Sequence, residues 1–123
     1  MLIPNPHTHA VIGAAIEVHR AVGPGLFESA YEEALAHEFS VRRMPYKRQV
    51  AVPFQYTGTR MGCVYRVDFV VHQIALELKS VETLLPLHDA QILSYMRMLK
   101  LSEGLLINFN VKRLVNGIRR FLL

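Results

Sequence analysis

The apolar positions in the first third of the chain recur with the period of an α-helix. They lie at Val11, Ala14, Ala15, Val18 and Val22, on one face of a helix that starts at the capping pair Asn5-Pro6. The glycines and proline of residues 23–25 must end this helix. A second apolar face, which includes Phe27, Tyr31 and Leu35, predicts another helix over residues 26–43.

From residue 50 the period changes from about 3.6 to 2, which is typical of β-strands. Strands are predicted over residues 50–56, 63–71, 74–81 and 104–109, with a helix over residues 86–100. Pro53 lacks an N–H group, so the first strand is expected at an edge of the sheet or at a bulge. The tail, residues 116–123, fits a strand or a helix, and Asn116-Gly117 favours a turn into a strand. The order α-α-β-β-β-α-β-(β) predicts an α/β (α+β) domain.

The amino-acid composition limits the classes of protein to which the chain can belong. The chain has 123 residues, of which 51% are apolar and 20% charged, so residues 1–123 are expected to form a single folded domain rather than a disordered chain. No run reaches about 18 apolar residues, so no membrane partner is expected. The single cysteine, Cys63, excludes an internal disulfide and favours a cytoplasmic location.

The charge balance is basic, with 14 Lys and Arg against 10 Asp and Glu, a net charge of +4. A basic surface suits an anionic partner such as nucleic acid, but it is equally an ordinary charge for solubility. Two basic clusters, in residues 42–48 and 112–120, either contact a phosphate backbone or simply face water.

The second and third predicted strands carry the most informative polar side chains. If a two-residue loop, His72-Gln73, joins these strands, Asp68 lies opposite Glu77, and Lys79 shares the face of Glu77. Cross-strand partners lie about 5 Å apart, so the two carboxylates repel unless a cation or a proton sits between them.

This pattern has two interpretations. Oxygen ligands of this kind suit Mg²⁺ or Mn²⁺, and an ammonium beside them could orient a water or stabilise phosphate charge. Alternatively, charged residues at alternate strand positions form a solvated sheet face with weak ion pairs. The residues alone leave both open.

Five motifs in chain order resemble the GxxExxY proteins, which are placed in the PD-(D/E)XK nuclease-like superfamily. They are GLFESAY at residues 25–31, YRVD at 65–68, ELK at 77–79, LHDAQILSY at 87–95 and LLINF at 105–109. The resemblance covers about residues 10–121. Val67 stands where the superfamily name has proline, a position that is not a ligand.

The resemblance implies a restriction-endonuclease-like core, with a central mixed β-sheet flanked by helices. It implies that Asp68, Glu77 and Lys79 are the catalytic D…(E)xK positions, and that Glu28 is an extra carboxylate at the metal site. Gln91 and Tyr95 resemble the QxxxY element of the RecB-like branch, four residues apart on one helix face.

The resulting hypothesis is a metal-dependent nuclease that hydrolyses phosphodiester bonds in DNA or RNA. We expect Asp68 and Glu77 to bind Mg²⁺, or Mn²⁺, with the carbonyl of Leu78 and with Glu28, while Lys79 positions the water. A chain this small has little surface beyond its catalytic core, so a homodimer is expected on a duplex substrate. The alternatives are a non-catalytic module for nucleic-acid or protein binding that keeps the fold, and a small-molecule phosphoesterase.

Overall fold

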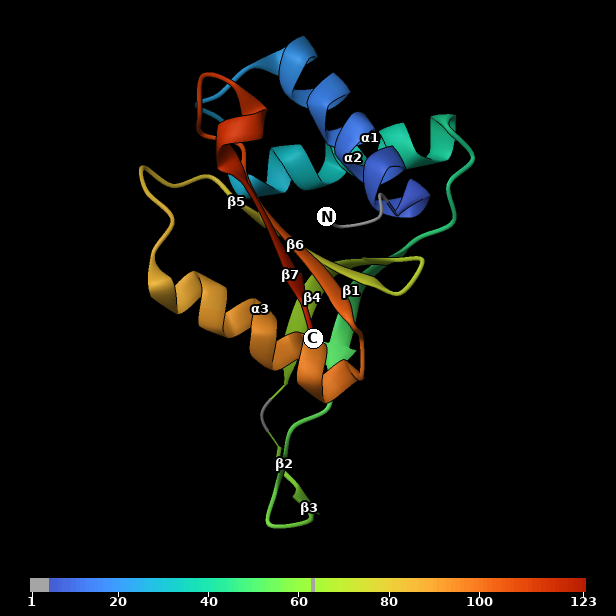
Figure 1. The fold of residues 1–123 in the computed structure, drawn as a ribbon, viewed down its shortest axis with the longest axis vertical. Coiled ribbons are helices and arrows are strands. Elements are labelled where there is room, and N and C mark those ends of the chain that lie inside the picture. The colour runs from blue at the N-terminus through green and yellow to red at the C-terminus, as the bar shows by residue number, and fades with distance from the viewer. Residues whose placement is uncertain (1–4, 63) are drawn as a thin grey trace.

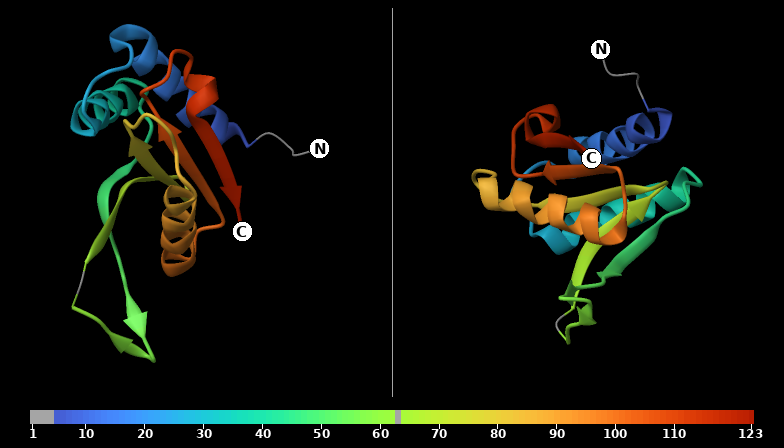
Figure 2. Two further views of the ribbon diagram at one scale, coloured as in Figure 1. Left: turned by 90° about the vertical axis from the view of Figure 1, so that its left-hand side faces the viewer. Right: turned by 60° about the horizontal axis from the view of Figure 1, so that its bottom comes forward.

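A five-stranded mixed sheet lies between two helices on one face and a single helix on the other (Figures 1 and 2). The computed structural model describes residues 5–62 and 64–123. The helices are α1 (Pro6–Val22), α2 (Glu28–Val41) and α3 (Pro86–Leu99), with a short 3-10 helix, η1 (Leu114–Gly117). The sheet strands are β1 (Lys47–Val52), β4 (Tyr65–Val71), β5 (Ile74–Lys79), β6 (Glu103–Asn108) and β7 (Ile118–Leu122), and β2 (Gln55–Tyr56) pairs with β3 (Thr59–Arg60) in a separate hairpin.

The sheet order is β1-β4-β5-β6-β7, and β5 and β6 are its parallel pair among antiparallel neighbours. The crossover between these parallel strands contains α3. The predicted mixed α/β architecture is therefore confirmed. No helix among residues 5–62 and 64–123 is long and apolar enough to cross a membrane.

The ends of the first two helices follow from local chemistry. The Asn5 side chain accepts a hydrogen bond from the His7 N–H at 2.9 Å, and Pro6 occupies the first helical position, as expected. Gly23 ends α1 with φ +72°, a conformation that glycine adopts without steric cost. The second helix starts at Glu28, two residues later than predicted, because Phe27 has an extended backbone as its N-cap residue, and the Leu26 N–H donates to the Tyr31 hydroxyl.

The strand predicted over residues 50–56 is wrong in its bounds. Pairing with β4 begins at Lys47 and stops at Val52, before Pro53, which has no N–H to donate. Residues 55–60 form the β2–β3 hairpin, which extends away from the sheet (Figure 1). The expectation that this strand lies at an edge is confirmed, since β1 is the outermost strand. Cys63, included in the next predicted strand, lies outside the described residues.

The tail adopts the strand alternative as β7, which pairs with β6. Asn116-Gly117 belongs to η1 rather than to a two-residue hairpin turn, because eleven positions separate the paired residues Ile107 and Ile118.

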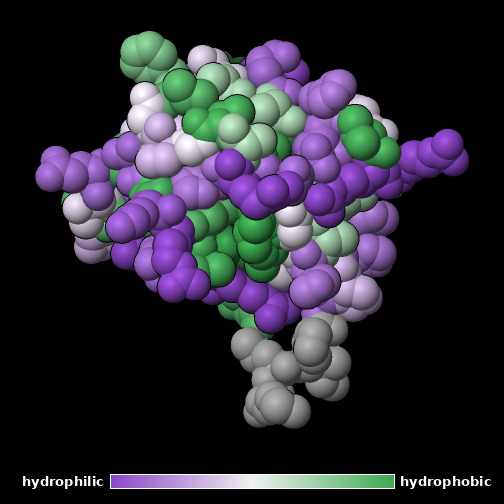
Figure 3. Space-filling view, turned by 90° about the horizontal axis from the view of Figure 1, so that it is seen from above, coloured by the Kyte–Doolittle hydropathy of each residue, from purple (hydrophilic) through white to green (hydrophobic). Residues whose placement is uncertain are grey.

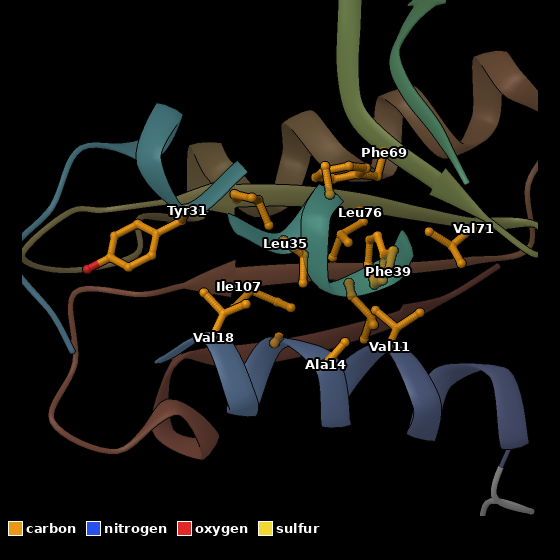
Figure 4. Close-up of a cluster of buried hydrophobic side chains, with 14 of the residues drawn as sticks. Val11, Ala14, Val18, Tyr31, Leu35, Phe39, Phe69, Val71, Leu76 and Ile107 are labelled. Carbon is orange, nitrogen blue, oxygen red and sulfur yellow. The ribbon is translucent and has the colours of Figure 1, made fainter. Parts of the chain in front are cut away.

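Two buried clusters hold the layers together. In the first, side chains of α1 and α2 such as Val11 and Phe39 meet Phe69, Leu76 and Ile107 of the sheet (Figure 4). The second cluster joins α3 to the opposite face of the sheet through residues that include Val67, Ala75, Ile92, Tyr95, Met96 and Leu106. The side-chain alternation of a strand predicts Val67 and Phe69 on one face of the sheet. This prediction is wrong: both are buried, but Val67 packs in the second cluster and Phe69 in the first. Pairing of β4 with β5 stops at Phe69. The part of β4 before Phe69 pairs with β1 alone and diverges from β5.

Some apolar surface stays outside these clusters. A groove of about 440 Å³ lies between α1 and α2, and alanines and valines line it together with Glu17, Glu33 and Glu38. The end of the molecule that carries these helices shows apolar patches within a hydrophilic surface (Figure 3).

Candidate active site

The turn between β4 and β5 determines which residues of the two strands lie opposite each other. The two strands pair from Phe69 and Leu76 towards a loop of two residues, His72 and Gln73. Both loop residues have positive φ, +48° and +67°, as in a type I′ hairpin turn, although neither residue type is favoured there. The hairpin register expected from the sequence is therefore confirmed.

Asp68 and Glu77 lie where β4 and β5 stop pairing. In a continuous ladder these two residues would form the next backbone pair. Here hydrogen bonds from the backbone to their side chains replace the bonds between the two backbones. The Asp68 N–H donates to Glu77 Oε1 at 3.0 Å, and the Leu78 N–H donates to Asp68 Oδ2 at 2.8 Å. Each carboxylate is thus anchored on the backbone of the opposite strand, which holds the pair at a fixed separation between diverging strands.

Burial and mutual repulsion disfavour the ionised form of this pair. Glu77 is only 7% exposed, and its burial, followed by the charge of Asp68, raises the pKa of Glu77 to about 8. Burial also raises the pKa of Asp68, although the hydrogen bond from Leu78 acts in the opposite direction. A buried glutamate bonded to its neighbour is not part of a solvated sheet face, so that interpretation is wrong for Glu77.

Lys79 is the cation next to this pair. Its Nζ lies 3.9 Å from Glu77 Oε2, and its side chain is 16% exposed. This is a long contact for an ion pair, so the ammonium is close enough to act electrostatically while its donors stay available. The alternation along β5 puts Glu77 and Lys79 on the same face, as predicted.

Two residues near Asp68, Gln49 and Glu32, were not singled out by the sequence. Gln49 Nε2 donates to Asp68 Oδ1 at 3.1 Å and also to Glu32 Oε1. The charge of Glu32 contributes to the raised pKa of Asp68. Glu32 lies one helical turn beyond Glu28, a spacing that could have identified it. Gln49 has no such signal, because its place depends on how β1 pairs with β4.

Glu28 lies in the first turn of α2 but contacts the chain beyond Lys79 rather than the carboxylate pair. The Ser80 N–H donates to Glu28 Oε2 at 3.4 Å, a long hydrogen bond, and Ser80 Oγ donates to the Leu26 carbonyl at 2.6 Å. The loop that delivers Glu28 is held by Tyr31, whose hydroxyl donates to the Gly23 carbonyl at 2.7 Å. The Tyr31 ring stacks on Phe109, with 4.4 Å between ring centres, so Tyr31 has a packing role and does not bond to the carboxylate pair.

Gln91 and Tyr95 lie on the face of α3 that covers the site. Tyr95 is 6% exposed, and burial, together with the charge of Glu77, raises the pKa of its hydroxyl. The neighbouring Gln91 side chain acts against that rise. Tyr95 therefore lies close enough to Glu77 for its hydroxyl to be affected by that charge.

A family model described as the PD-(D/E)XK nuclease superfamily matches residues 5–121, nearly the whole chain. The chain belongs to the PD-(D/E)XK nuclease superfamily. No curated protein and no solved structure matches it significantly.

PD-(D/E)XK nucleases generally use divalent metal ions, and the donor set at this site suits one. Asp68 and Glu77 put two acidic side chains next to a single ammonium, so a divalent cation would offset charge that Lys79 cannot. Among residues 5–62 and 64–123 no third Asp, Glu, His or Cys completes a group of three possible ligands. Mg²⁺ does not require one, because it commonly binds through one or two carboxylates and fills its shell with water and substrate phosphate.

The backbone carbonyl of Leu78 is a further oxygen beside the two carboxylates. In an antiparallel strand the N–H and C=O of one residue point to the same side. The Leu78 N–H points to Asp68, while the carbonyl of Lys79, the next residue, accepts from Phe109 on the β6 side. The Leu78 carbonyl is therefore directed towards the gap that Asp68 borders.

In this member of the nuclease superfamily, most arginines of the two basic clusters form ion pairs with acidic side chains. Their partners are Glu38 for Arg42, Glu32 and Glu33 for Arg48, Asp89 for Arg119 and Glu103 for Arg120. These guanidiniums hold elements of the fold together, so a phosphate contact by any of them would compete with an existing pair.

Proposed function

We propose that the chain is a metal-dependent nuclease that hydrolyses phosphodiester bonds in DNA or RNA. The observation that carries the proposal is the reciprocal anchoring of Asp68 and Glu77 beside Lys79. Burying two carboxylates together is unfavourable, and folding alone gives no reason to keep the arrangement. A site that holds a metal ion next to a phosphate does require two carboxylates close together.

We propose that Asp68, Glu77 and the Leu78 carbonyl would hold Mg²⁺, or Mn²⁺ in its place. When bound, the ion supplies positive charge for the leaving oxygen and lowers the pKa of a coordinated water. Glu28 is proposed as a more distant acidic group, because its carboxylate at the start of α2 is separated from the pair by Ser80. A divalent cation or the substrate would have to draw it inwards.

Lys79 is proposed to orient the attacking water and to stabilise negative charge on the phosphate as it develops. Its Nζ is a donor, held near Glu77 on a buried stem, so little reorganisation is needed when that charge appears. The Gln91 amide and the Tyr95 hydroxyl lie on the α3 side and would position the substrate strand. A homodimer on a duplex substrate and a cytoplasmic location are further parts of the proposal, and the single cysteine supports the second of these.

A non-catalytic nucleic-acid-binding module is the second candidate. It is favoured by the raised pKa of Glu77, since a protonated Glu77 with Asp68 and Lys79 makes a neutral cluster that needs no metal. Such a module would bind nucleic acid in a salt-dependent way without hydrolysing it.

The test is a cleavage assay on single-stranded, duplex and branched DNA and on RNA, with Mg²⁺, Mn²⁺ or EDTA. Wild type is compared with Asp68→Asn and Lys79→Ala, and with Glu17→Gln on the outside of α1 as a matched control. We expect cleavage that requires the metal, falls about 100-fold or more in Lys79→Ala and is unchanged in the control. Folded protein that binds these substrates but cleaves none of them in either metal would support the binding module instead.

A further inference from the structure

A pocket with aromatic walls lies beside the candidate active site. It has a volume of about 230 Å³, far more than the roughly 30 Å³ that one water occupies, and lies between α3 and the chain segments that lead to and from the β2–β3 hairpin. Its lining residues are Phe54, Tyr65, Gln91, Ser94, Tyr95 and Met98. The proposed hydrolysis uses two of these, Gln91 and Tyr95, and leaves the others without a role.

The aromatic rings of this pocket are spaced apart rather than stacked. The ring centre of Tyr65 lies 6.1 Å from that of Phe54 and 6.2 Å from that of Tyr95, with interplanar angles of 82° and 43°. Tyr65 is 44% exposed, so part of its ring is open to a ligand. Open aromatic surface of this kind binds nucleobases by stacking, whatever the base, because every base has a π-face.

Polar groups in the pocket complement the edge of a base and a phosphate. The Gln91 amide and the Ser94 hydroxyl offer both donors and acceptors. The exposed guanidinium of Arg97 donates to Ser94 Oγ at 3.4 Å, so a positive charge lies directly beside the pocket. Arg97, unlike Arg42, Arg48, Arg119 and Arg120, has no acidic partner among the ion pairs of the described residues.

The pocket lies near the carboxylates, along both β4 and α3. Tyr65 precedes Asp68 by three residues in β4, which is roughly 10 Å along a strand. On the α3 side, Tyr95 lines the pocket and lies close enough to Glu77 to sense its charge. A strand whose phosphate lies at Asp68 and Glu77 would therefore bring a neighbouring base to the pocket.

We propose that this pocket binds an unpaired base next to the reacting phosphodiester, so that the substrate is a single strand, or a duplex with an unpaired end, flap or loop. A base stacked and paired inside a continuous duplex cannot enter a pocket between a helix and a strand without leaving the stack. This inference rests on the proposed function for the reacting phosphate, but the binding of the base can be tested without hydrolysis.

The first test measures binding in EDTA, where no cleavage interferes. A single-stranded oligonucleotide that contains 2-aminopurine is titrated with wild type, Tyr65→Ala, Tyr65→Phe and Tyr56→Ala, following anisotropy and base fluorescence. Tyr56 is an exposed tyrosine of β2 that does not line the pocket, so its variant is the matched control. We expect Tyr65→Ala to weaken binding about 5- to 100-fold and to lose the quenching, while the other two variants resemble wild type.

The second test compares structures of the nucleic acid. Wild type should bind the single strand at least tenfold more tightly than a blunt duplex of the same sequence, and Arg97→Ala should lower the salt dependence of single-strand binding by about one phosphate contact. Equal binding of blunt duplex and single strand would overturn the proposal, as would unchanged quenching in Tyr65→Ala. If those results accompany metal-dependent duplex cleavage, the nuclease remains and only the pocket proposal fails. Tyr65-dependent binding without any cleavage would instead support the pocket and count against the nuclease.

Discussion

The backbone N–H of Asp68 donates to the side chain of Glu77 across the last gap between β4 and β5, at 3.0 Å. The bond holds Glu77 in a buried position beside a second carboxylate, so its ionisation is coupled to the stability of the fold. This coupling can be measured without knowing the substrate.

We predict that the metal-free protein loses stability as the pH rises. The folded-state pKa of Glu77, about 8, lies above its ordinary value of 4.5, so the stabilisation from its protonated form is complete below about pH 4.5 and is lost as the pH rises through about 8. Glu77→Gln imitates the protonated form. It should raise the melting temperature in EDTA at pH 8.5 by roughly 5 °C, with little change at pH 5. The control is Glu82→Gln, an exposed side chain; equal pH profiles for wild type and Glu77→Gln would contradict the prediction.

Divalent cation binding should release a proton. At pH 7 Glu77 is mostly protonated in the metal-free site, and a carboxylate must be ionised to be a ligand. Titration calorimetry with Mn²⁺ in two buffers of different ionisation enthalpy should give close to one proton released per ion at pH 7, and less at pH 9. Glu77→Gln should abolish the release. A proton count of zero for wild type at pH 7 would mean that the ion binds elsewhere or that Glu77 is already ionised.

The loop between the two strands is strained, and removing the strain should stabilise the hairpin. Gln73 has φ +67°, a left-handed conformation that costs a residue with a side chain on the order of 1 kcal/mol relative to glycine. Gln73→Gly should raise the free energy of unfolding by about that amount in urea denaturation. Gln73→Ala keeps the strain and is the matched control; if alanine stabilised as much as glycine, the backbone argument would be wrong.

The stabilisation that Glu103 contributes should depend on pH in the opposite direction to that of Glu77. It is buried at the start of β6 and accepts from Asn5 and Thr8 of the N-terminal segment and from Arg120 of β7. Burial alone would raise its pKa, but these hydrogen bonds outweigh burial and lower it. Its stabilisation is therefore present above about pH 4.5 and is lost as the pH falls through the lowered pKa.

Glu103→Gln should accordingly cost about 1–3 kcal/mol at pH 7, because it removes the charge that Arg120 pairs with and leaves buried donors poorly matched. Urea denaturation should show a larger difference at pH 7 than at pH 3, because the stabilisation from the ionised Glu103 decreases as the pH falls. Thr8→Val provides an independent variant of the same cluster, and it should destabilise in the same direction.

The sequence was sufficient where structure depends on neighbours along the chain. A two-residue loop determines the register of a hairpin, and the side-chain period of two then places Asp68, Glu77 and Lys79 together. The helix starts at Asn5 and Pro86 follow equally local rules. These features required no knowledge of how distant segments pack.

The sequence was insufficient where distant segments meet. The contact of Gln49 with Asp68 depends on the pairing of β1 with β4, across the β2–β3 hairpin. The pocket between Phe54, Tyr65 and α3 depends on the same pairing. The ion pairs of Arg119 and Arg120 join elements that are far apart in the chain, so a cluster that looked free for phosphate is engaged with acidic partners.

The two apolar clusters and the diverging end of β4 and β5 use largely different side chains. The proposed chemistry and the stability of the fold can therefore change independently. Exchange of Glu77 for glutamine would remove a carboxylate that the proposed reaction needs and, by the pH dependence predicted above, would leave the metal-free protein more stable at alkaline pH. In this chain a gain in alkaline stability would then accompany a loss of the proposed activity.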